Sequence, residues 1–316
     1  MEDPSAGSAD AEAGAASAMG SGFMGDGLPP SRIQTYYMWI QSMIPAPGGA
    51  MSRMIAYVSP GPADVPAALG DDVLTSFAAL SRVHADGWGA GWRTSAGVGA
   101  RVVAGRPATR HDLARAVRVP ATAALLYLRF GSAESGTGEA EAQPFLFGDE
   151  AFQHNGALSP PDRLRAELTD GERADLRGSN DSELYFARLR RALTPGTVPD
   201  PVRIADAVAA VRESYPEACL NALLLTPTAL VAVHSSASRP APHAAFAARG
   251  FAEADLPPGH GDDYNVLFTR RTASGARLVA TTGIPLAGWT PLPADTVSLV
   301  TPASVASTPV PRRASA

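Results

Sequence analysis

Hydrophobic and polar positions alternate over short distances in this chain, in a mixture of strand and helix periods. Short apolar or alternating runs predict strands at 54–58, 89–93, 97–103, 123–130, 145–147, 151–154, 221–225, 230–234, 265–269 and 277–282. Turn-forming residues separate the last two pairs of runs, Pro227 in one case and Gly275 in the other. We therefore expect two antiparallel hairpins near the C-terminal end.

Apolar residues at helical spacing predict helices around 73–80, 184–193 and 204–211. The second of these begins at Asn180, and Glu183 follows three residues later, which is the spacing of a capping box. Interleaved strands and helices indicate a layered fold of the α/β or α+β class. The pattern alone does not decide between them.

The two ends of the chain lack this periodicity. Residues 1–30 are Ala, Gly, Ser and acidic residues without a repeat, and the Pro- and Gly-rich segment 45–49 marks a boundary. We therefore expect an extension over 1–50 that is disordered or precedes the true start. One domain is expected over 51–301, and a flexible tail over 302–316.

Composition and charge exclude several classes of protein. The 26 basic residues are all Arg and form no block, and the net charge is −5, which argues against a nucleic-acid partner. A single cysteine, Cys219, excludes a disulfide framework and a multi-cysteine metal site. No apolar run is long enough to span a membrane, and no signal peptide is evident. A cytoplasmic protein without a membrane partner is expected.

One candidate motif joins glycines and tryptophans in a short segment that contains His84, Asp86, Gly87 and Trp88. This composition is typical of a tight turn that feeds a strand, and we interpret it as structural. The alternative is a metal site in which His84 and Asp86 are joined by His154. The sequence shows no further cluster of metal-ligating residues nearby, so we expect no metal.

A second motif, His154-Asn155-Gly156, follows a short apolar strand. An Asn amide and a Gly N–H at a strand end can both donate to one point, as an oxyanion hole requires. The alternative interpretation is a plain Asn-Gly turn. The motif alone does not separate the two.

Two charged residues complete the set of candidates. Arg129 ends an apolar run, and a buried Arg usually needs a carboxylate partner. Asp181 lies in the first turn of a predicted helix beside Glu183; capping accounts for Glu183 and leaves Asp181 to face a cationic group. An Arg for a carboxylate and an Asp for an ammonium together describe an amino-acid site.

The order of these motifs resembles the class II glutamine amidotransferases of the stand-alone kind. Such proteins begin Met-Cys-Arg, and this chain has Met51-Ser52-Arg53. The Asp-Gly-Trp-Gly block, the strand-end Arg129, the Pro144-Phe145 pair and the motifs at 154–156 and 181–183 then follow in the family's order. The resemblance covers residues 51–301.

The resemblance implies a fold and a chemistry. The fold is the α+β N-terminal-nucleophile hydrolase sandwich of four layers, αββα, with two antiparallel sheets. Ser52 takes the nucleophile position, with its own α-amine as the base. Asn155 and Gly156 would form the oxyanion hole. The substrate, glutamine or a γ-glutamyl amide, would be bound by three further residues: Arg129 at its α-carboxylate, Asp181 at its α-ammonium, and His154. No cofactor is implied.

The chain departs from the family at several of these positions. Ser52 replaces the usual Cys, Tyr127 replaces a His, and Gln143 and Ser179 replace a usual His and Asp. A serine hydroxyl depends more on its base than a thiol does. Either a retuned amidohydrolase or an inactive relative that keeps the amino-acid pocket would show these changes.

The segment before Ser52 leaves a further alternative open. If Met51 is the true start, removal of that methionine exposes the α-amine of Ser52. If residues 1–51 are retained, the amine is blocked. We expect the first. Because no ammonia-accepting domain is evident, either a partner protein accepts ammonia or the amide is simply hydrolysed. The size and layout are similar to those of relatives in ergothioneine biosynthesis that cleave a γ-glutamyl amide bond.

Overall fold

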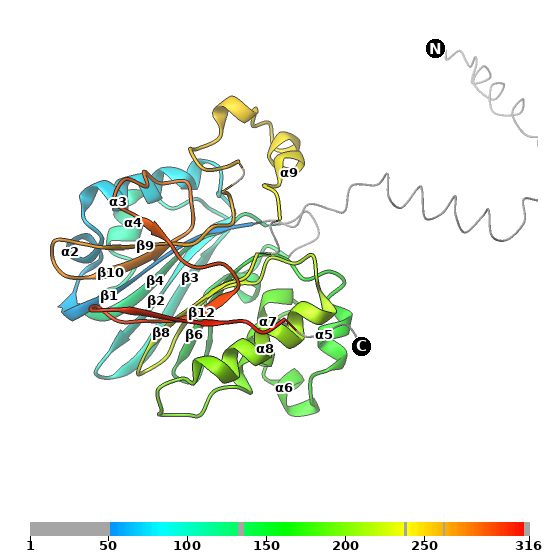
Figure 1. The fold of residues 1–316 in the computed structure, drawn as a ribbon. Helices are drawn as coiled ribbons and strands as arrows, with labels where there is room; N and C mark the ends of the chain where they lie inside the picture. Colours follow the sequence, from blue (N-terminus) through cyan, green and yellow to red (C-terminus); the bar gives the residue numbers. More distant parts are fainter. Residues whose placement is uncertain (1–50, 132–135, 237–238, 262, 313–316) are drawn as a thin grey trace, which may run out of the picture. The chain divides into compact units, whose positions relative to one another are not determined.

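The strands of this protein form two antiparallel sheets. The structure is a computed structural model that describes residues 51–131, 136–236, 239–261 and 263–312, so the predicted extension over 1–50 lies outside the described residues. These residues belong to one compact unit, Gly48–Ala316. In the described ranges the strand orders are β11-β9-β10-β1-β4-β2-β3 and β13-β12-β8-β7-β6-β5 (Figure 1).

The strands of the first sheet are β1 (Arg53–Ala63), β2 (Gly87–Thr94), β3 (Gly97–Ala104), β4 (Ala121–Leu128), β9 (Phe268–Arg271), β10 (Arg277–Ala280) and β11 (Thr290–Pro291). Those of the second sheet are β5 (Phe145–Phe147), β6 (Glu150–Asn155), β7 (Asn221–Leu225), β8 (Leu230–His234), β12 (Thr296–Val300) and β13 (Val305–Pro309).

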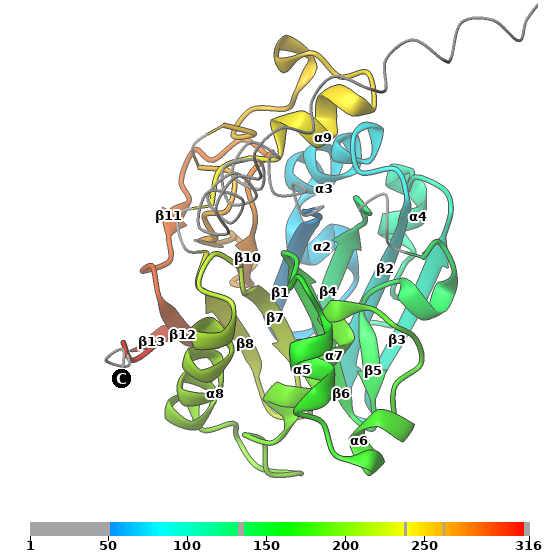
Figure 2. The same cartoon turned by 90° about the vertical axis from the view of Figure 1, so that its right-hand side faces the viewer.

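Helices cover the outer face of each sheet. Those on the first sheet are α2 (Val65–Leu69), α3 (Asp71–Ala79) and α4 (Arg110–Ala114). Those on the second are α5 (Asp162–Ala166), α7 (Asp181–Arg190) and α8 (Pro201–Ser214), and the short helix α6 (Asp170–Ala174), which has no buried residue, lies between α5 and α7 in the chain. A further helix, α9 (His243–Ala248), projects with its following loop at one end of the molecule (Figures 1 and 2). The predicted α+β sandwich of four layers is confirmed.

Strand β1 shows how the layers arise from sequence. Ile55 and Tyr57 pack into the core between the first sheet and its helices, whereas Met54 and Ala56 pack into the core between the two sheets. Successive strand side chains point to opposite faces, so a strand with both faces covered is apolar throughout. This arrangement buries the start of β1, where the candidate nucleophile lies.

Most predicted strands and both hairpins are confirmed. The strands over 145–147, 221–225 and 230–234 have the predicted bounds, and β7 pairs with β8 and β9 with β10. The run predicted over 123–130 stops at Leu128, so Arg129 lies in the loop that follows. The strand predicted from 265 begins only at Phe268.

The prediction of a flexible tail from residue 302 is wrong for its first part. Val305–Pro309 forms the edge strand β13, which pairs antiparallel with β12 from Thr296 to Val300. This strand has few apolar residues because an edge strand exposes much of its surface. The ladder of backbone hydrogen bonds holds it without a local hydrophobic signal.

The capping box predicted at α7 forms only in half. The Asn180 side chain accepts a hydrogen bond from Ser182 N at 2.9 Å and so caps the helix. The Glu183 carboxylate does not return to Asn180 but accepts from Arg177 N and Gly178 N at 2.9 and 3.0 Å. Glu183 therefore holds the loop that precedes the helix.

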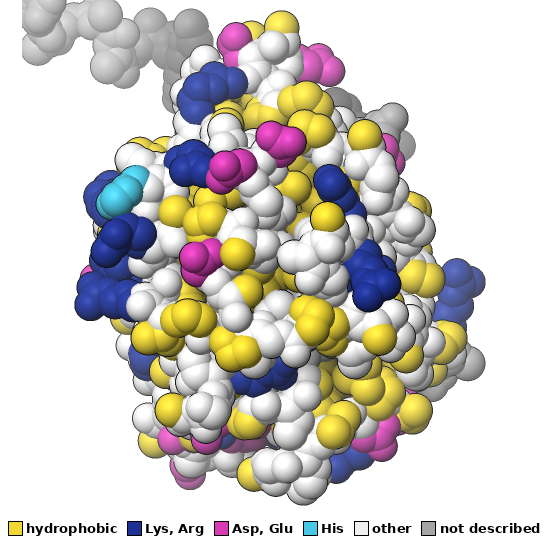
Figure 3. All heavy atoms as spheres, turned by 90° about the vertical axis from the view of Figure 1, so that its left-hand side faces the viewer, with side chains coloured by type: hydrophobic (Ala, Val, Ile, Leu, Met, Phe, Trp, Pro, Cys, Tyr) yellow, Lys and Arg dark blue, Asp and Glu magenta, His cyan; other side chains and the backbone are white. Residues whose placement is uncertain are grey.

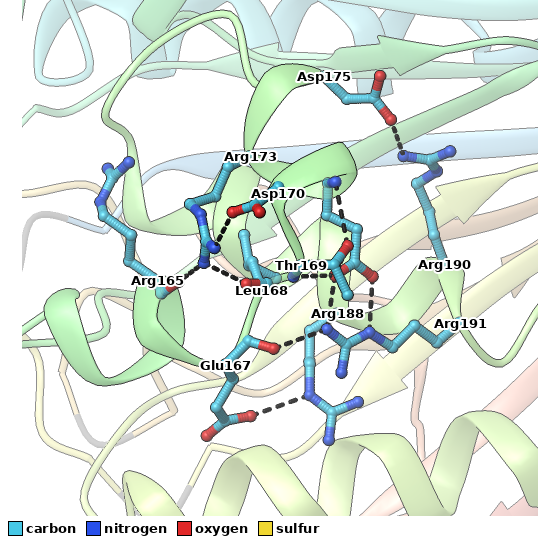
Figure 4. Close-up of polar contacts among 11 residues, drawn as sticks. Arg165, Glu167, Leu168, Thr169, Asp170, Arg173, Asp175, Arg188, Arg190 and Arg191 are labelled. Atoms are coloured by element: carbon cyan, nitrogen blue, oxygen red, sulfur yellow. Dashed lines mark hydrogen bonds and ion pairs between the residues drawn. The ribbon is translucent and has the colours of Figure 1, made fainter.

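Charged side chains join α5, α6 and α7 at the surface. Figure 4 shows Arg188 and Arg191 reaching Glu167, through an Arg188 Nε to carboxylate contact of 3.0 Å and an Arg191 Nη2 to carbonyl contact of 2.8 Å. Exposed pairs of this kind contribute little individually, typically under about 1 kcal/mol. They tie the exposed ends of α5 and α6, of which α6 has no buried residue, to the well-packed helix α7.

The surface carries scattered charge. On the face drawn in Figure 3, Arg and acidic side chains occur at several separate places with hydrophobic side chains between them. Within the described ranges, no helix combines the length and the apolar character that crossing a bilayer requires.

Candidate active site

Ser52 lies immediately before β1 and is only 3% exposed. Its Oγ accepts hydrogen bonds from the Tyr127 hydroxyl at 2.6 Å and from Phe130 N at 3.2 Å. Tyr127 is on the neighbouring strand β4, where it pairs with Met54. Burial raises the pKa of the Tyr127 phenol, so it remains a donor. Ser52 is thus a buried hydroxyl with two protein donors directed at its oxygen.

Asn155 and Gly156 lie at the end of β6 in the second sheet. Asn155 is fully buried, and neither its Nδ2 nor its Oδ1 has a hydrogen-bond partner among the described residues. An unpaired buried amide is costly unless a ligand pairs with it. A Cβ on Gly156 would come within 1.8 Å of the Cys219 carbonyl oxygen, so only glycine fits here. The placement of both residues is compatible with the oxyanion-hole prediction.

His154 positions these two residues through contacts at both ring nitrogens. Its Nε2 lies 2.8 Å from the Cys219 carbonyl and its Nδ1 lies 2.9 Å from Ser182 Oγ. Burial lowers the pKa of His154, so the ring is neutral: Nε2 donates to the carbonyl and Nδ1 accepts from the serine. Both ring nitrogens of His154 therefore contact protein atoms, so neither is available for the predicted substrate contact. The position of His154 favours a supporting role.

The same segment is joined to Ser52 by Tyr127. The Tyr127 hydroxyl lies 2.6 Å from Ser52 Oγ and 3.5 Å from the His154 carbonyl oxygen. Gln143 accepts from His154 N through its side-chain oxygen at 2.6 Å. The two sheets thus meet at the candidate nucleophile.

Arg129 and Asp181 both lie near this junction. Burial is the largest cause of the raised pKa of Tyr127; the charge of Arg129 lowers this pKa, and the charge of Asp181 raises it. Arg129 Nη2 donates to the Gly136 carbonyl at 2.6 Å. Asp181 Oδ2 accepts from Leu158 N at 2.6 Å. Each therefore already organises a loop beside the site, a role that the sequence does not reveal.

The predicted structural turn supports the same region. Asp86 Oδ2 accepts from Gly131 N at 2.6 Å and lies 2.7 Å from Arg249 Nη2. Gly87 has a φ of 142° and no room for a Cβ, which would lie 2.7 Å from the Val103 carbonyl oxygen. Trp88 is buried in the core beneath the first sheet's helices. The Asp-Gly-Trp segment therefore fixes the loop after Arg129 and secures the segment after α9.

The alternative metal site is not assembled. His84 Nε2 lies 3.2 Å from His260 Nε2, whereas His154 contacts Ser182 and Cys219. Among the described residues, no group of three or more His, Cys, Asp or Glu side chains could hold a metal ion. The thiol of Cys219 is buried, which raises its pKa to about 12 and makes it a poor nucleophile.

Sequence reasoning missed two residues next to Ser52. Tyr264 donates through its hydroxyl to the Met51 carbonyl at 2.8 Å, and its ring lies 3.6 Å below the Arg53 guanidinium carbon. Arg53 itself is fully buried. The one available signal was an Arg at the start of an otherwise apolar strand.

The chain thus forms a sandwich of two antiparallel sheets in which Ser52 lies immediately before β1, the central strand of the first sheet. Residues 51–307 match the family model for class-II glutamine amidotransferases. The chain therefore belongs to that family. No curated protein sequence matches it.

Two solved structures share the fold. One is glutamine phosphoribosylpyrophosphate amidotransferase from B. subtilis, solved with ADP and GMP, with a TM-score of 0.52 and 15% identity over 83% of this chain and 50% of that chain. The other is a glutamine aminotransferase class-II domain protein from Silicibacter pomeroyi, with a TM-score of 0.52 and 17% identity over 82% of this chain and 99% of that chain. The chain thus spans half the length of the B. subtilis enzyme.

Proposed function

We propose that this protein is an amidohydrolase that cleaves glutamine or a γ-glutamyl amide, with Ser52 as an N-terminal nucleophile. The observation that carries the proposal is the environment of Ser52 Oγ, which is buried and accepts from Tyr127 at 2.6 Å and from Phe130 N at 3.2 Å. Both donors stabilise negative charge that develops on this oxygen.

The proposed reaction needs a free α-amine on Ser52, which loss of Met51 supplies. That amine has an ordinary pKa near 8, so part of it is neutral at pH 7 and can act as a base. Ser52 Oγ attacks the amide carbon while its proton passes to the amine. Asn155 Nδ2 and Gly156 N would donate to the oxyanion. The unpaired state of the buried Asn155 amide supports this assignment.

Collapse of the intermediate breaks the C–N bond, and the protonated α-amine of Ser52 returns its proton to the leaving amine. A glutamyl ester on Ser52 remains, and water hydrolyses it to glutamate and the free hydroxyl. Arg129 would bind the substrate α-carboxylate and Asp181 its α-ammonium. With glutamine as substrate, the ammonia either passes to a partner protein or is released.

A second candidate function is a non-catalytic protein that keeps the amino-acid pocket. The observation in its favour is that Met51, the residue before Ser52, packs into a buried apolar cluster. Met51 is 1% exposed, and its carbonyl accepts a hydrogen bond from Tyr264. While Met51 is present, the nitrogen of Ser52 is an amide and cannot act as a base.

Turnover by chains with different N-termini tests the two functions. A chain beginning at Ser52 should hydrolyse glutamine or γ-glutamyl amides, and Ser52→Ala should lower its rate at least about 10³-fold without preventing ligand binding. The chain that retains Met51 is the matched control and should be inactive. A rate that Ser52→Ala leaves unchanged would contradict the proposal; binding without any turnover would support the second candidate.

A further inference from the structure

Arg53 presents a bare guanidinium edge inside the protein. Its Nη1 donates to the Tyr264 carbonyl at 3.1 Å, and the guanidinium stacks on the Tyr264 ring at 3.6 Å from the centroid. Its Nε and Nη2 have no hydrogen-bond partner among the described residues, although the side chain is fully buried. These two nitrogens form the edge that binds the two oxygens of a carboxylate in parallel.

No charge within the described ranges offsets that of Arg53. Its neighbours His84 and His260 are neutral, because burial and the Arg53 charge lower both pKa values, that of His260 to about 3. The Nδ1 atoms of both histidines also lack partners. None of the ion pairs formed by the described residues includes Arg53. A buried cation without a partner anion is strongly unfavourable, which points to an anionic ligand.

The position of Arg53 indicates which part of a substrate would supply that anion. The ring of Tyr264 stacks on Arg53, and its hydroxyl binds the carbonyl of Met51, the group bonded to Ser52 N. Tyr264 therefore links Met51 to Arg53, and loss of Met51 would leave space beside Ser52 N on the side where Tyr264 lies. In the proposed reaction the leaving amine must reach Ser52 N to collect its proton. The amine half of the substrate would accordingly lie in that space.

We propose that Arg53 binds a carboxylate on the amine half of the substrate, so that the preferred substrates are γ-glutamyl amides of amino acids rather than glutamine. Met51 belongs to a buried apolar cluster with Val83, Phe130, Phe246 and Tyr264, which would border the space that it vacates. These apolar side chains suit the carbon atoms of an amino acid better than they suit ammonia. The inference rests on the proposed function, because that function determines which half of the substrate leaves beside Ser52 N.

Paired substrates test this inference. For a chain beginning at Ser52, kcat/KM for γ-glutamyl-alanine should exceed that for γ-glutamyl-alanine amide, its neutral match, by about 10- to 100-fold. Arg53→Met should abolish this preference: kcat/KM for γ-glutamyl-alanine should fall at least about 10-fold more than kcat/KM for γ-glutamyl-alanine amide. Arg53→Lys should restore part of the preference, since it keeps the charge but not the two parallel donors.

A matched control is Arg93→Met on β2. Arg93 is partly buried, and it donates to Thr122 Oγ1 at 3.3 Å and to the Thr226 carbonyl at 3.3 Å. This variant should keep the carboxylate preference. An equal loss on both substrates in Arg53→Met, or no preference in the unaltered chain, would overturn the inference.

Binding separates failure of this inference from failure of the proposed function. In a Ser52→Ala chain without Met51, calorimetry should show the same preference in Kd, and adding Arg53→Met should remove it. If no substrate is hydrolysed but this preference is measured, the amidohydrolase proposal fails and the role of Arg53 stands. If both substrates are hydrolysed equally, the role of Arg53 fails and the amidohydrolase proposal stands.

Discussion

At the scale of single residues, the proposed nucleophile Ser52 lies beside the hydroxyl of Tyr127. A serine alkoxide is far less stable than a thiolate, so a serine nucleophile gains more from donors directed at its oxygen. Tyr127 supplies such a donor at 2.6 Å and Phe130 N a second at 3.2 Å. With both donors on Oγ, the hydroxyl proton is free to point toward an acceptor such as the α-amine.

Tyr127→Phe tests this arrangement. The variant keeps the ring that packs between the sheets and removes only the hydroxyl. We expect kcat of the chain beginning at Ser52 to fall about 10²-fold, as for loss of one donor to a developing oxyanion. The free energy of unfolding should change by less than about 1.5 kcal/mol. Rates are measured at saturating substrate and stability by denaturant titration.

Ser52→Cys provides the control for this prediction. In a Ser52→Cys background, Tyr127→Phe should lower kcat much less, because a thiolate needs less help from a donor. Equal losses in both backgrounds would show that Tyr127 acts through packing rather than through its hydroxyl.

At the scale of elements, the end of β6, which carries the candidate oxyanion hole, is joined to Ser52 through the Tyr127 hydroxyl. Its last residues are locked to the segment before β7: His154 Nε2 contacts the Cys219 carbonyl at 2.8 Å, and Asn155 pairs with Asn221. Gly156 sits against the same carbonyl with no space for a methyl group. The geometry of this end therefore depends on close backbone packing.

Gly156→Ala should disrupt this element. The new Cβ would lie 1.8 Å from a backbone oxygen and 2.6 Å from His154 Nε2, so the backbone must shift. We expect a loss of about 1–3 kcal/mol in the free energy of unfolding, typical of overpacking, and loss of turnover. Gly171→Ala in α6 is the control, since a methyl group there would meet no other atom within 4 Å. That variant should be neutral or slightly stabilising; an equal effect of both changes would contradict the account.

The sequence predicted elements better than contacts. Strands with a strong apolar pattern, such as β7 and β8, were predicted with correct bounds because both of their faces are buried. The edge strand β13 was missed because its stability comes from pairing with β12, which local pattern does not encode. The short helix α9 was missed for a similar reason, since only Phe246 of its residues is buried.

The sequence singled out residues that the structure places near Ser52, but it did not reveal their contacts, and their roles stay predictions. Asn155 and Gly156 lie in positions compatible with the oxyanion-hole prediction, and Arg129 and Asp181 lie near Tyr127. The loop contacts of Asp181 and the bare edge of Arg53 depend on partners far along the chain, Leu158 and Tyr264. Periodicity and spacing carry no information on such pairs.

At the scale of the whole molecule, four of the six histidines are buried with lowered pKa values: His84, His154, His234 and His260. Burial is the main cause in each case. The folded protein therefore keeps them neutral, whereas the unfolded chain protonates them below about pH 6.5. The unfolded state then binds more protons, so stability rises with pH through this window and is lost on acidification.

We therefore expect the free energy of unfolding to fall between pH 7 and pH 5, by up to about 1.4 kcal/mol per pH unit for each such histidine. The lowered pKa of Glu172, to about 2, adds stability that is lost only at lower pH and leaves this window unaffected. Guanidinium titrations at several pH values measure the slope. His260→Gln should make it shallower, and a free energy that does not change from pH 7 to pH 5 would contradict the prediction.

The most direct test of the central claim is covalent labelling of Ser52 with the diazoketone analogue of glutamine, read by intact mass and peptide mapping. A nucleophilic Ser52 Oγ displaces dinitrogen from this analogue and keeps the carbon skeleton as an ether. For a chain beginning at Ser52 we predict one adduct, located on Ser52, and none in the Ser52→Ala variant or in a chain that retains Met51. No adduct, or an adduct that persists in Ser52→Ala, would contradict the assignment of Ser52 as the nucleophile.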